Sequence, residues 1–241
     1  MFIVRLALAL AFALPALSTV RAGDVAELEI LGFSADGKIF AFEEYGVQDG
    51  SGFPYANRYY IDTETDKFLP GTPIRARIDN ENATVADARG QVKSNAQSVI
   101  SDEVLAAHRG HTAGFSPVTE LSGDPFRMTV NPRPVFPPID TPLEFRLEEQ
   151  LIDAPDSCEL FGARIGFRLF RVTVEDGART QLIHEDRTIP SSRGCPLGYR
   201  IAAVETFYPK DRSPVFAVLI AMRTGGFEGP DYRYLAVTGR F

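Results

Sequence analysis

Apolar and polar residues alternate with a period of two along several short stretches of the chain. The alternation is strict in residues 143–151, LEFRLEEQL, and it returns in residues 163–186, which read as a hairpin over an Asp-Gly turn. Such a period is typical of strands that bury one face. The positions predicted to face inward are Leu143, Phe145 and Leu147 in the first stretch and Ile165, Phe167 and Leu169 in the second.

Both ends of the chain show the same kind of pattern. Residues 24–70 read as strands separated by tight turns, including the Asp-Gly turn of SADGK and a loop rich in Gly, Asp and Pro, VQDGSGFPYAN. Near the C-terminus, YRIAAVETFY, VFAVLIAMR and YRYLAVTGRF complete the predicted strands. The pattern predicts a mainly β protein with antiparallel, blade-like sheets, arranged as in a propeller or a sandwich.

One segment has the period of a helix. Between residues 84 and 108, small and apolar residues recur at steps of three and four, and Thr84 with Asp87 forms a capping pair at the start. Gly110 is a natural terminator, whereas Gly90 weakens the helix interior. We therefore expect one helix near residues 84–108, inserted in the β protein and packed on a sheet.

A proline-rich connector at residues 131–142, NPRPVFPPIDTP, suggests a boundary between two halves, 23–130 and 143–241. A shift of 175 residues aligns the ends of the chain: Asp36 with Asp211, Arg58 with Arg233, and Tyr59 with Tyr234. This alignment indicates an internal repeat. The alternative is convergence, because all hairpins share turn residues and alternating strands.

Residues 1–22 form an export signal, with a basic start, a short apolar run and small residues before a cleavage site that leaves Gly23 first. The alternative is a membrane anchor, but Pro15 interrupts the run, which is shorter than the ~20 residues a spanning helix needs. We expect a single exported β-rich domain, residues 23–241, in the periplasm or secreted, with no membrane span after cleavage.

Net charge restricts the classes of binding partner, and the cysteine content predicts a covalent link. Removing residues 1–22 takes away Arg5 and Arg21 and changes the net charge from −7 to −9. Such an acidic chain, with no basic run, is unsuited to nucleic acid. Cys158 and Cys195 are its only cysteines, and export favours a structural disulfide between them. The alternative is a pair of free or redox-active thiols, although there is no Cys-x-x-Cys motif.

The usual signatures of catalysis and cofactor binding are missing from the sequence. There is no Gly-x-Ser-x-Gly elbow, phosphate loop or dinucleotide fingerprint, so we predict no cofactor and assign no catalytic residue. His108 and His111 are better read as a helix end than as zinc ligands, and His184 as a surface residue at a strand end. A calcium site is weighed against a plain polar turn at these oxygen-bearing residues: Asp49, Ser51, Asp62, Glu64 and Asp66.

Two Gly-Phe loops are the best candidates for function. The segments DGSGFPYANRYY and TGGFEGPDYRYL place four aromatic residues on flexible backbone, as binding loops do: Phe53, Tyr55, Phe227 and Tyr232. The alternative is that these rings cap the core. We expect a non-enzymatic module that binds an unknown protein or a small envelope ligand. The other candidate is an envelope hydrolase that uses four acidic residues: Glu43, Glu44, Asp49 and Asp231.

Two resemblances support this interpretation. FSADGKIFAF and RYYIDTETDK resemble the turn and strands of a TolB-type, WD40-like β-propeller blade. LGFSADGKIFAFEEYGVQDGSGFPY and GFEGPDYRYLAV resemble a family of predicted secreted bacterial proteins, domain of unknown function 2259. That family resemblance implies export in Gram-negative bacteria and no assigned activity, and it carries no catalytic residues to this chain.

Overall fold

The computed structural model describes residues 23–153, 158, 162, 164–172 and 180–241, which form three antiparallel sheets. The predicted export signal and the second Asp-Gly turn lie outside these residues. The first sheet contains β1 (Glu27–Phe33), β2 (Ile39–Val47), β3 (Pro54–Asp62), β4 (Lys67–Phe68) and β5 (Ile74–Arg77). The middle sheet contains β6 (His111–Phe115), β11 (Pro196–Phe207), β12 (Val215–Gly225) and β13 (Pro230–Arg240). The third contains β7 (Arg127–Val130), β8 (Leu143–Ile152), β9 (Arg164–Val172) and β10 (Gln181–Glu185).

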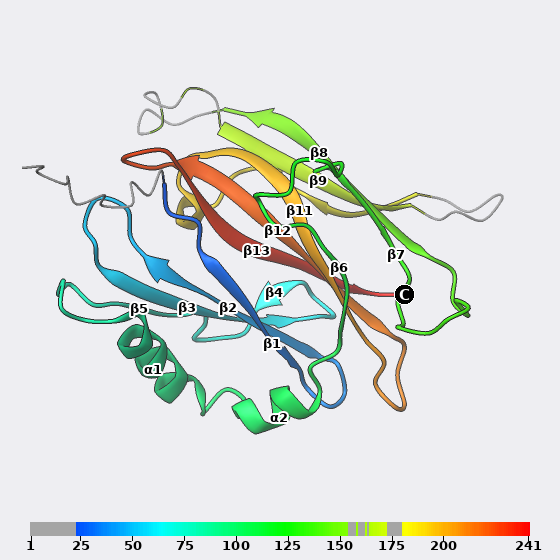
Figure 1. Cartoon of the computed structure of the whole chain (residues 1–241). Helices are drawn as coiled ribbons and strands as arrows, with labels where there is room; N and C mark the ends of the chain where they lie inside the picture. The colour runs from blue at the N-terminus through cyan, green and yellow to red at the C-terminus, as the bar shows by residue number, and fades with distance from the viewer. Residues whose placement is uncertain (1–22, 154–157, 159–161, 163, 173–179) are drawn as a thin grey trace, which may run out of the picture.

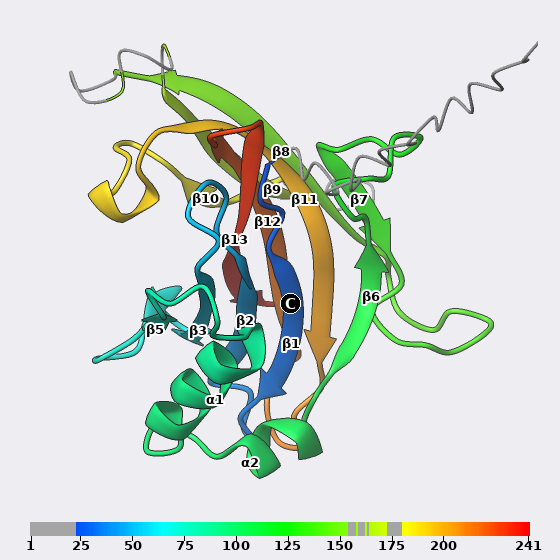
Figure 2. The same ribbon diagram turned by 60° about the vertical axis from the view of Figure 1, so that its left-hand side comes forward.

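The three sheets stack in layers, with β11, β12 and β13 between the other two sheets (Figures 1 and 2). Strand β12 shows why the middle sheet is buried on both faces. Ala217 and Leu219 belong to the core shared with the first sheet, whereas Phe216, Val218 and Ile220 belong to the core shared with the third. A strand covered on both faces needs apolar residues at every position, which explains the continuous run VFAVLIAM.

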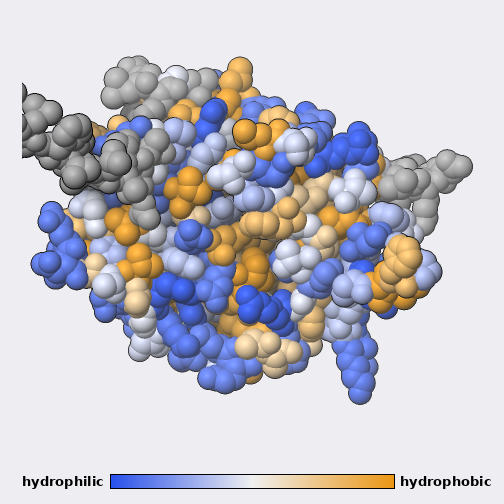
Figure 3. Space-filling view, in the orientation of Figure 1, coloured by the Kyte–Doolittle hydropathy of each residue, from blue (hydrophilic) through white to orange (hydrophobic). Residues whose placement is uncertain are grey.

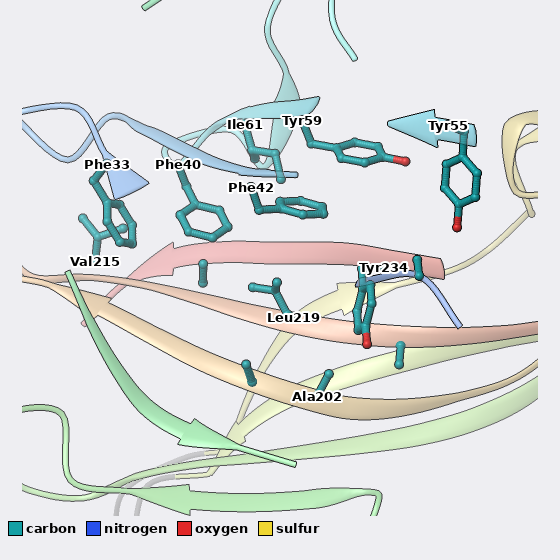
Figure 4. Close-up of a cluster of buried hydrophobic side chains, with 14 residues drawn as sticks. Phe33, Phe40, Phe42, Tyr55, Tyr59, Ile61, Ala202, Val215, Leu219 and Tyr234 are labelled. Carbon is teal, nitrogen blue, oxygen red and sulfur yellow. The ribbon is translucent and has the colours of Figure 1, made fainter. Parts of the chain in front are cut away.

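The first core pairs large side chains with small ones. Phe33, Phe40 and Phe42 project from the first sheet toward Val215 and Leu219 of β12 (Figure 4). Their rings form a continuous row, with centroids 4.9 Å apart for Phe33 and Phe40 and 6.0 Å apart for Phe40 and Phe42. Aromatic residues from the first sheet and mainly alanine, valine and leucine from the middle sheet fill the space between the two sheets.

The helical segment contains two helices, α1 (Val85–Ala96) and α2 (Asp102–Ala107). The prediction of one continuous helix near residues 84–108 was therefore wrong. Thr84 caps α1 in a capping box with Asp87, as predicted, and Gly90 is accommodated inside the helix. The break falls at residues 97–101, where the Ser101 hydroxyl accepts a hydrogen bond from the Val104 N–H and starts α2. Both helices cover the outer face of the first sheet (Figure 2).

The proline-rich connector joins β7 to β8, which pair with each other in the third sheet. Strand β6, which precedes the connector, pairs with β11, which follows it. The two predicted halves therefore interlock through shared sheets. The segments compared in the repeat, residues 33–63 and 208–238, correspond to β2–β3 and β12–β13, which are both antiparallel hairpins. An ancestral repeat remains a prediction.

The disulfide prediction is confirmed: Cys158 and Cys195 are bonded, with Cα atoms 5.6 Å apart. The fold class is also confirmed as mainly β with antiparallel sheets. Five of the six predicted inward positions of β8 and β9 are buried, with Phe145, Phe167 and Leu169 fully enclosed, and Ile165 is half-buried. The sheets form layers, and the propeller-like resemblance is not confirmed.

Candidate functional site

The fold brings the two Gly-Phe loops into contact. One loop connects β2 to β3 and the other connects β12 to β13. The Asp49 carboxylate in the first loop accepts hydrogen bonds from the backbone N–H groups of Phe227 (2.7 Å) and Glu228 (2.9 Å) in the second. Gly50 lies directly against the Phe227 side chain, since a Cβ added to it would be 3.4 Å from Phe227 Cβ. A single carboxylate thus fixes two loops that are 178 residues apart in sequence.

The four predicted binding aromatics occupy different environments. The Phe227 ring is 83% exposed, whereas Phe53 and Tyr232 are half-buried and Tyr55 is buried in the first core. Tyr232 also pairs through its backbone with Asp24, near the start of the described chain. Phe227 is therefore the one ring of the four that is strongly exposed, while Tyr55 belongs to the core beneath the loops.

A groove of about 470 Å³ lies beside the joined loops, between the edge of the first sheet and β13. Strand register places its side chains: Tyr55 of β3 is opposite Arg77 of β5, and Asn57 is opposite Arg75. Directly opposed residues of an antiparallel pair project to the same face. The groove is lined by Gln48, Tyr55, Asn57, Arg75, Ala76, Arg77, Asp79 and Arg233.

A buried ion pair stiffens one wall of the groove. Arg233 donates to the Asp24 carboxylate (2.5 Å) and to the backbone carbonyls of Asp24 and Tyr232 (both 2.9 Å). The Tyr55 hydroxyl donates to the other Asp24 oxygen at 3.1 Å, and its ring lies 4.7 Å from the Arg233 guanidinium. Burial raises the pKa of Asp24 and outweighs the opposing effect of Arg233. Burial also raises the pKa of Tyr55 far above its ordinary value, so it is a neutral donor.

The buried Glu44 of β2 links the first sheet to the middle sheet through its hydrogen bonds. Its Oε1 accepts from Tyr59 Oη (2.7 Å) and Asn57 Nδ2 (3.0 Å), and its Oε2 accepts from the backbone N–H of Tyr234 (2.7 Å). Both oxygens are satisfied, as a buried carboxylate requires. Burial and the adjacent Glu44 raise the pKa of Tyr59 well above its ordinary value. This cluster fixes the position of Asn57 at the base of the groove.

The four acids of the hydrolase interpretation each bind other groups of the protein. Glu43 and Glu44 are neighbours on β2, so their side chains point to opposite faces of the sheet. Glu43 faces the helices and binds Arg58 (2.6 Å) and Arg89 (2.5 Å). Asp49 holds the second loop, and Asp231 accepts from the Asp24 N–H at 2.8 Å. Each of these carboxylates has a structural role.

Two of the residues weighed as metal ligands, Asp62 and Asp66, bind backbone N–H groups, and Glu64 pairs with Arg212 at 2.8 Å. Asp62 accepts from the N–H groups of Glu64 (2.8 Å) and Thr65 (3.0 Å), and Asp66 accepts from the Thr238 N–H at 2.7 Å. His108 binds the Val104 carbonyl at the end of α2. Across residues 23–153, 164–172 and 180–241, no group of three or more potential ligands is poised to hold a metal.

His184 was wrongly predicted as a surface residue. Its ring stacks on Phe167 with centroids 4.6 Å apart, and its Nε2 lies 3.1 Å from Asp186 Oδ1. Asp186 also binds Arg193 at 2.7 Å. Burial acts to lower the pKa of His184, but hydrogen bonds with Asp186 and Asp66 outweigh it and raise the pKa above its ordinary value. This residue ties β10 to the turn between β3 and β4.

A further buried acid lies in the middle sheet. Glu205 of β11 is 1% exposed, and its Oε1 has no hydrogen-bond partner within the described part of the chain. Burial raises the pKa of Glu205 to about 7, while Thr112 and Arg109 oppose that rise. Glu205 does not line the groove, so it bears on stability rather than on binding.

Replacing Glu205 with glutamine is expected to stabilise the protein at pH 8 but not at pH 4.5. Between an unfolded pKa near 4.5 and the folded value of about 7, the folded state binds more protons, so wild-type stability falls as pH rises. The difference reaches at most about 3 kcal/mol above pH 7. Urea denaturation at both pH values checks this, with the exposed Glu81→Gln as control. An equal effect of Glu205→Gln at the two pH values would contradict it.

The surface in Figure 3 is mostly polar, with apolar residues gathered in a central hollow and at the right-hand edge. The β7–β8 connection lies at that edge in Figure 1, and it carries the strongly exposed Val135, Phe136 and Ile139. Phe136 is 96% exposed, which is comparable to the exposure of Phe227.

The sequence interpretation missed the arginines of the groove. Arg75 and Arg77 are two residues apart in the segment IRAR, the spacing that places two side chains on one face of a strand. That spacing was the available signal. It was inconspicuous because β5 is only four residues long and follows a Gly-Thr-Pro turn.

The layered antiparallel sheets and the disulfide define a mainly β, disulfide-bonded protein. The chain belongs to the family described as Predicted secreted protein (DUF2259), whose model matches residues 41–240. No curated protein matches the chain, and no solved structure matches it. No helix in the described ranges is long and apolar enough to cross a membrane.

Proposed function

We propose that this secreted protein is a non-enzymatic binding module of the Gram-negative periplasm, with the joined Gly-Phe loops and the adjacent groove as its binding face. The observation that carries the proposal is the bridge from Asp49 to the backbone of Phe227 and Glu228. This bridge holds an exposed aromatic ring on a fixed loop. Rigid aromatic anchors of this kind bind with little loss of conformational entropy.

The arrangement favours binding over catalysis because its carboxylates already serve the fold. Asp49, Glu44 and Asp24 each accept hydrogen bonds from protein donors. The side chains at this surface that do not belong to a carboxylate network are the exposed Phe227 ring, Gln48, which binds Ser51, and Arg75, which binds the neutral Tyr59 hydroxyl. A protein partner or a small envelope ligand fits this surface.

Replacing Phe227 with alanine is expected to weaken binding of the ligand about tenfold or more, the effect typical of an exposed aromatic anchor. A thermal-shift screen of the mature protein against glycans, peptides and divalent metals identifies a ligand, and calorimetry then measures its affinity. The matched control is Phe136→Ala, since Phe136 is equally exposed but lies on the β7–β8 connection. Equal affinities for the wild type and Phe227→Ala would contradict the proposal.

A further inference from the structure

The groove beside the Gly-Phe loops has a chemical character of its own. We propose that it binds an anionic group, a carboxylate or a phosphate, on a small ligand, and that Arg75 makes the main contact. This inference rests on the proposed binding function and adds the ligand class. Gln48 connects the two features, because it lines the groove and accepts a hydrogen bond from Ser51 of the first loop at 3.1 Å.

The charge of the groove is opposite to that of the protein. Three arginines and one aspartate line it, whereas the whole chain carries a net charge of −7. Arg77 is paired with Asp79 (2.7 Å), and Arg233 is paired with Asp24. Across the described residues, Arg75 has no carboxylate partner within ion-pair distance. Its side chain hydrogen-bonds the neutral Tyr59 hydroxyl, so Arg75 is the arginine of the groove lining that is not paired with a carboxylate.

Strand geometry makes this cluster suitable for anion recognition. Arg75 and Arg77 stand on the same face of β5, opposite Asn57 and Tyr55 of β3. Residues two apart on a strand are separated by roughly 6.5–7 Å, close enough for two guanidinium groups to reach one ligand. A guanidinium offers two parallel N–H donors that match the oxygens of a carboxylate or a phosphate.

The remaining lining groups suit the neutral part of a ligand. Gln48 and Asn57 bring side-chain amides to the groove, and Arg233 lies over the Tyr55 ring, held there by Asp24. A volume of about 470 Å³ is within the range of small-molecule sites. The groove therefore matches a compact ligand with one anionic group and several hydroxyls.

Isothermal titration calorimetry with the mature protein tests the inference. The probes are glucuronate, its uncharged methyl ester, glucose and inorganic phosphate, each in low and high salt. We expect glucuronate or phosphate to bind and the two neutral sugars to bind at least tenfold more weakly, with affinity for the anion falling as salt rises. Binding by glucuronate alone identifies a carboxylate ligand, and binding by phosphate alone identifies a phosphorylated one.

Arg75→Gln is expected to reduce anion affinity about tenfold or more, because a charge-assisted contact is lost. Arg75 is exposed, so the variant keeps the fold, and Arg187→Gln, an exposed substitution outside the groove, provides the control. Failure of both anions to bind, or unchanged affinity in Arg75→Gln, overturns the inference. If a neutral ligand binds instead and its affinity depends on Phe227, the anion inference fails while the proposed binding function stands.

Discussion

Replacing Arg58 with methionine is expected to lower the free energy of unfolding by about 3–5 kcal/mol. Arg58 is buried beneath the helices, with its Nε 2.6 Å from Glu43 Oε2 and its Nη1 2.7 Å from Asp102 Oδ1. Methionine fills much of the same space but carries no charge. Glu43, which is fully buried, then loses one of its two arginine partners. Leaving a buried charge under-compensated costs far more than losing a surface pair.

Urea denaturation at pH 7 measures this effect. The matched control is Arg187→Met, since Arg187 forms an ion pair with Glu185 at 3.1 Å but its side chain is 88% exposed. Such a surface pair contributes about 0–1 kcal/mol. The double variant Arg58→Met with Glu43→Gln is expected to recover part of the loss, because the stranded charge is gone. Equal losses in Arg58→Met and Arg187→Met would show that the Arg58 network is screened by water.

Removing the disulfide is expected to lower the free energy of unfolding by about 4 kcal/mol. Cys158 and Cys195 are 37 residues apart, and closing a loop of that length restricts the unfolded chain by this amount in the chain-entropy model. The loop spans β9 and β10, so the bond stabilises the third sheet in particular. The double variant Cys158→Ala with Cys195→Ala, compared with the wild type in urea, checks the value.

Chemical reduction provides an independent test of this expected loss of stability. Reduction of the wild-type protein by dithiothreitol should reproduce the midpoint of the double variant, and dithiothreitol should leave the double variant unchanged. A double variant as stable as the oxidised wild type would mean that the bond adds nothing to the native state.

The sequence was sufficient to predict the elements that are specified by neighbouring residues, such as strands with an apolar–polar period and a helix with a local cap. The alternation of Leu143, Phe145 and Leu147 marks the buried face of β8. The helix cap at Thr84 is confirmed because its partner Asp87 is local. Strands β6 and β7 were missed, since HTAGF and RMTV contain only five and four residues, too few to establish a period. The order of these strands depends on partners far along the chain.

The loops of the candidate site were predictable from the sequence, but the buried contacts that hold these loops in place were not. The Gly-Phe segments stand out locally, whereas the contacts that join them are made over 178 residues. Glu44 resembles a surface acid in the sequence, yet it binds the Tyr234 N–H, 190 residues away. Burial of such an acid depends on tertiary packing, which no local pattern encodes. The same reason explains why the groove around Arg75 was missed.

The burial of the middle sheet on both faces affects how this protein aggregates when it partly unfolds. Its strand β12 is apolar along VFAVLIAM, between Pro214 and Arg223, and both faces of that strand are covered only when the two outer sheets are in place. Once an outer sheet detaches, an uncharged segment of high β propensity is free to pair with its copy in another molecule. Variants that loosen the outer layers should therefore be lost to aggregation on heating before they reach equilibrium with the unfolded chain. Urea, which solvates such segments, is the denaturant suited to comparing their stabilities.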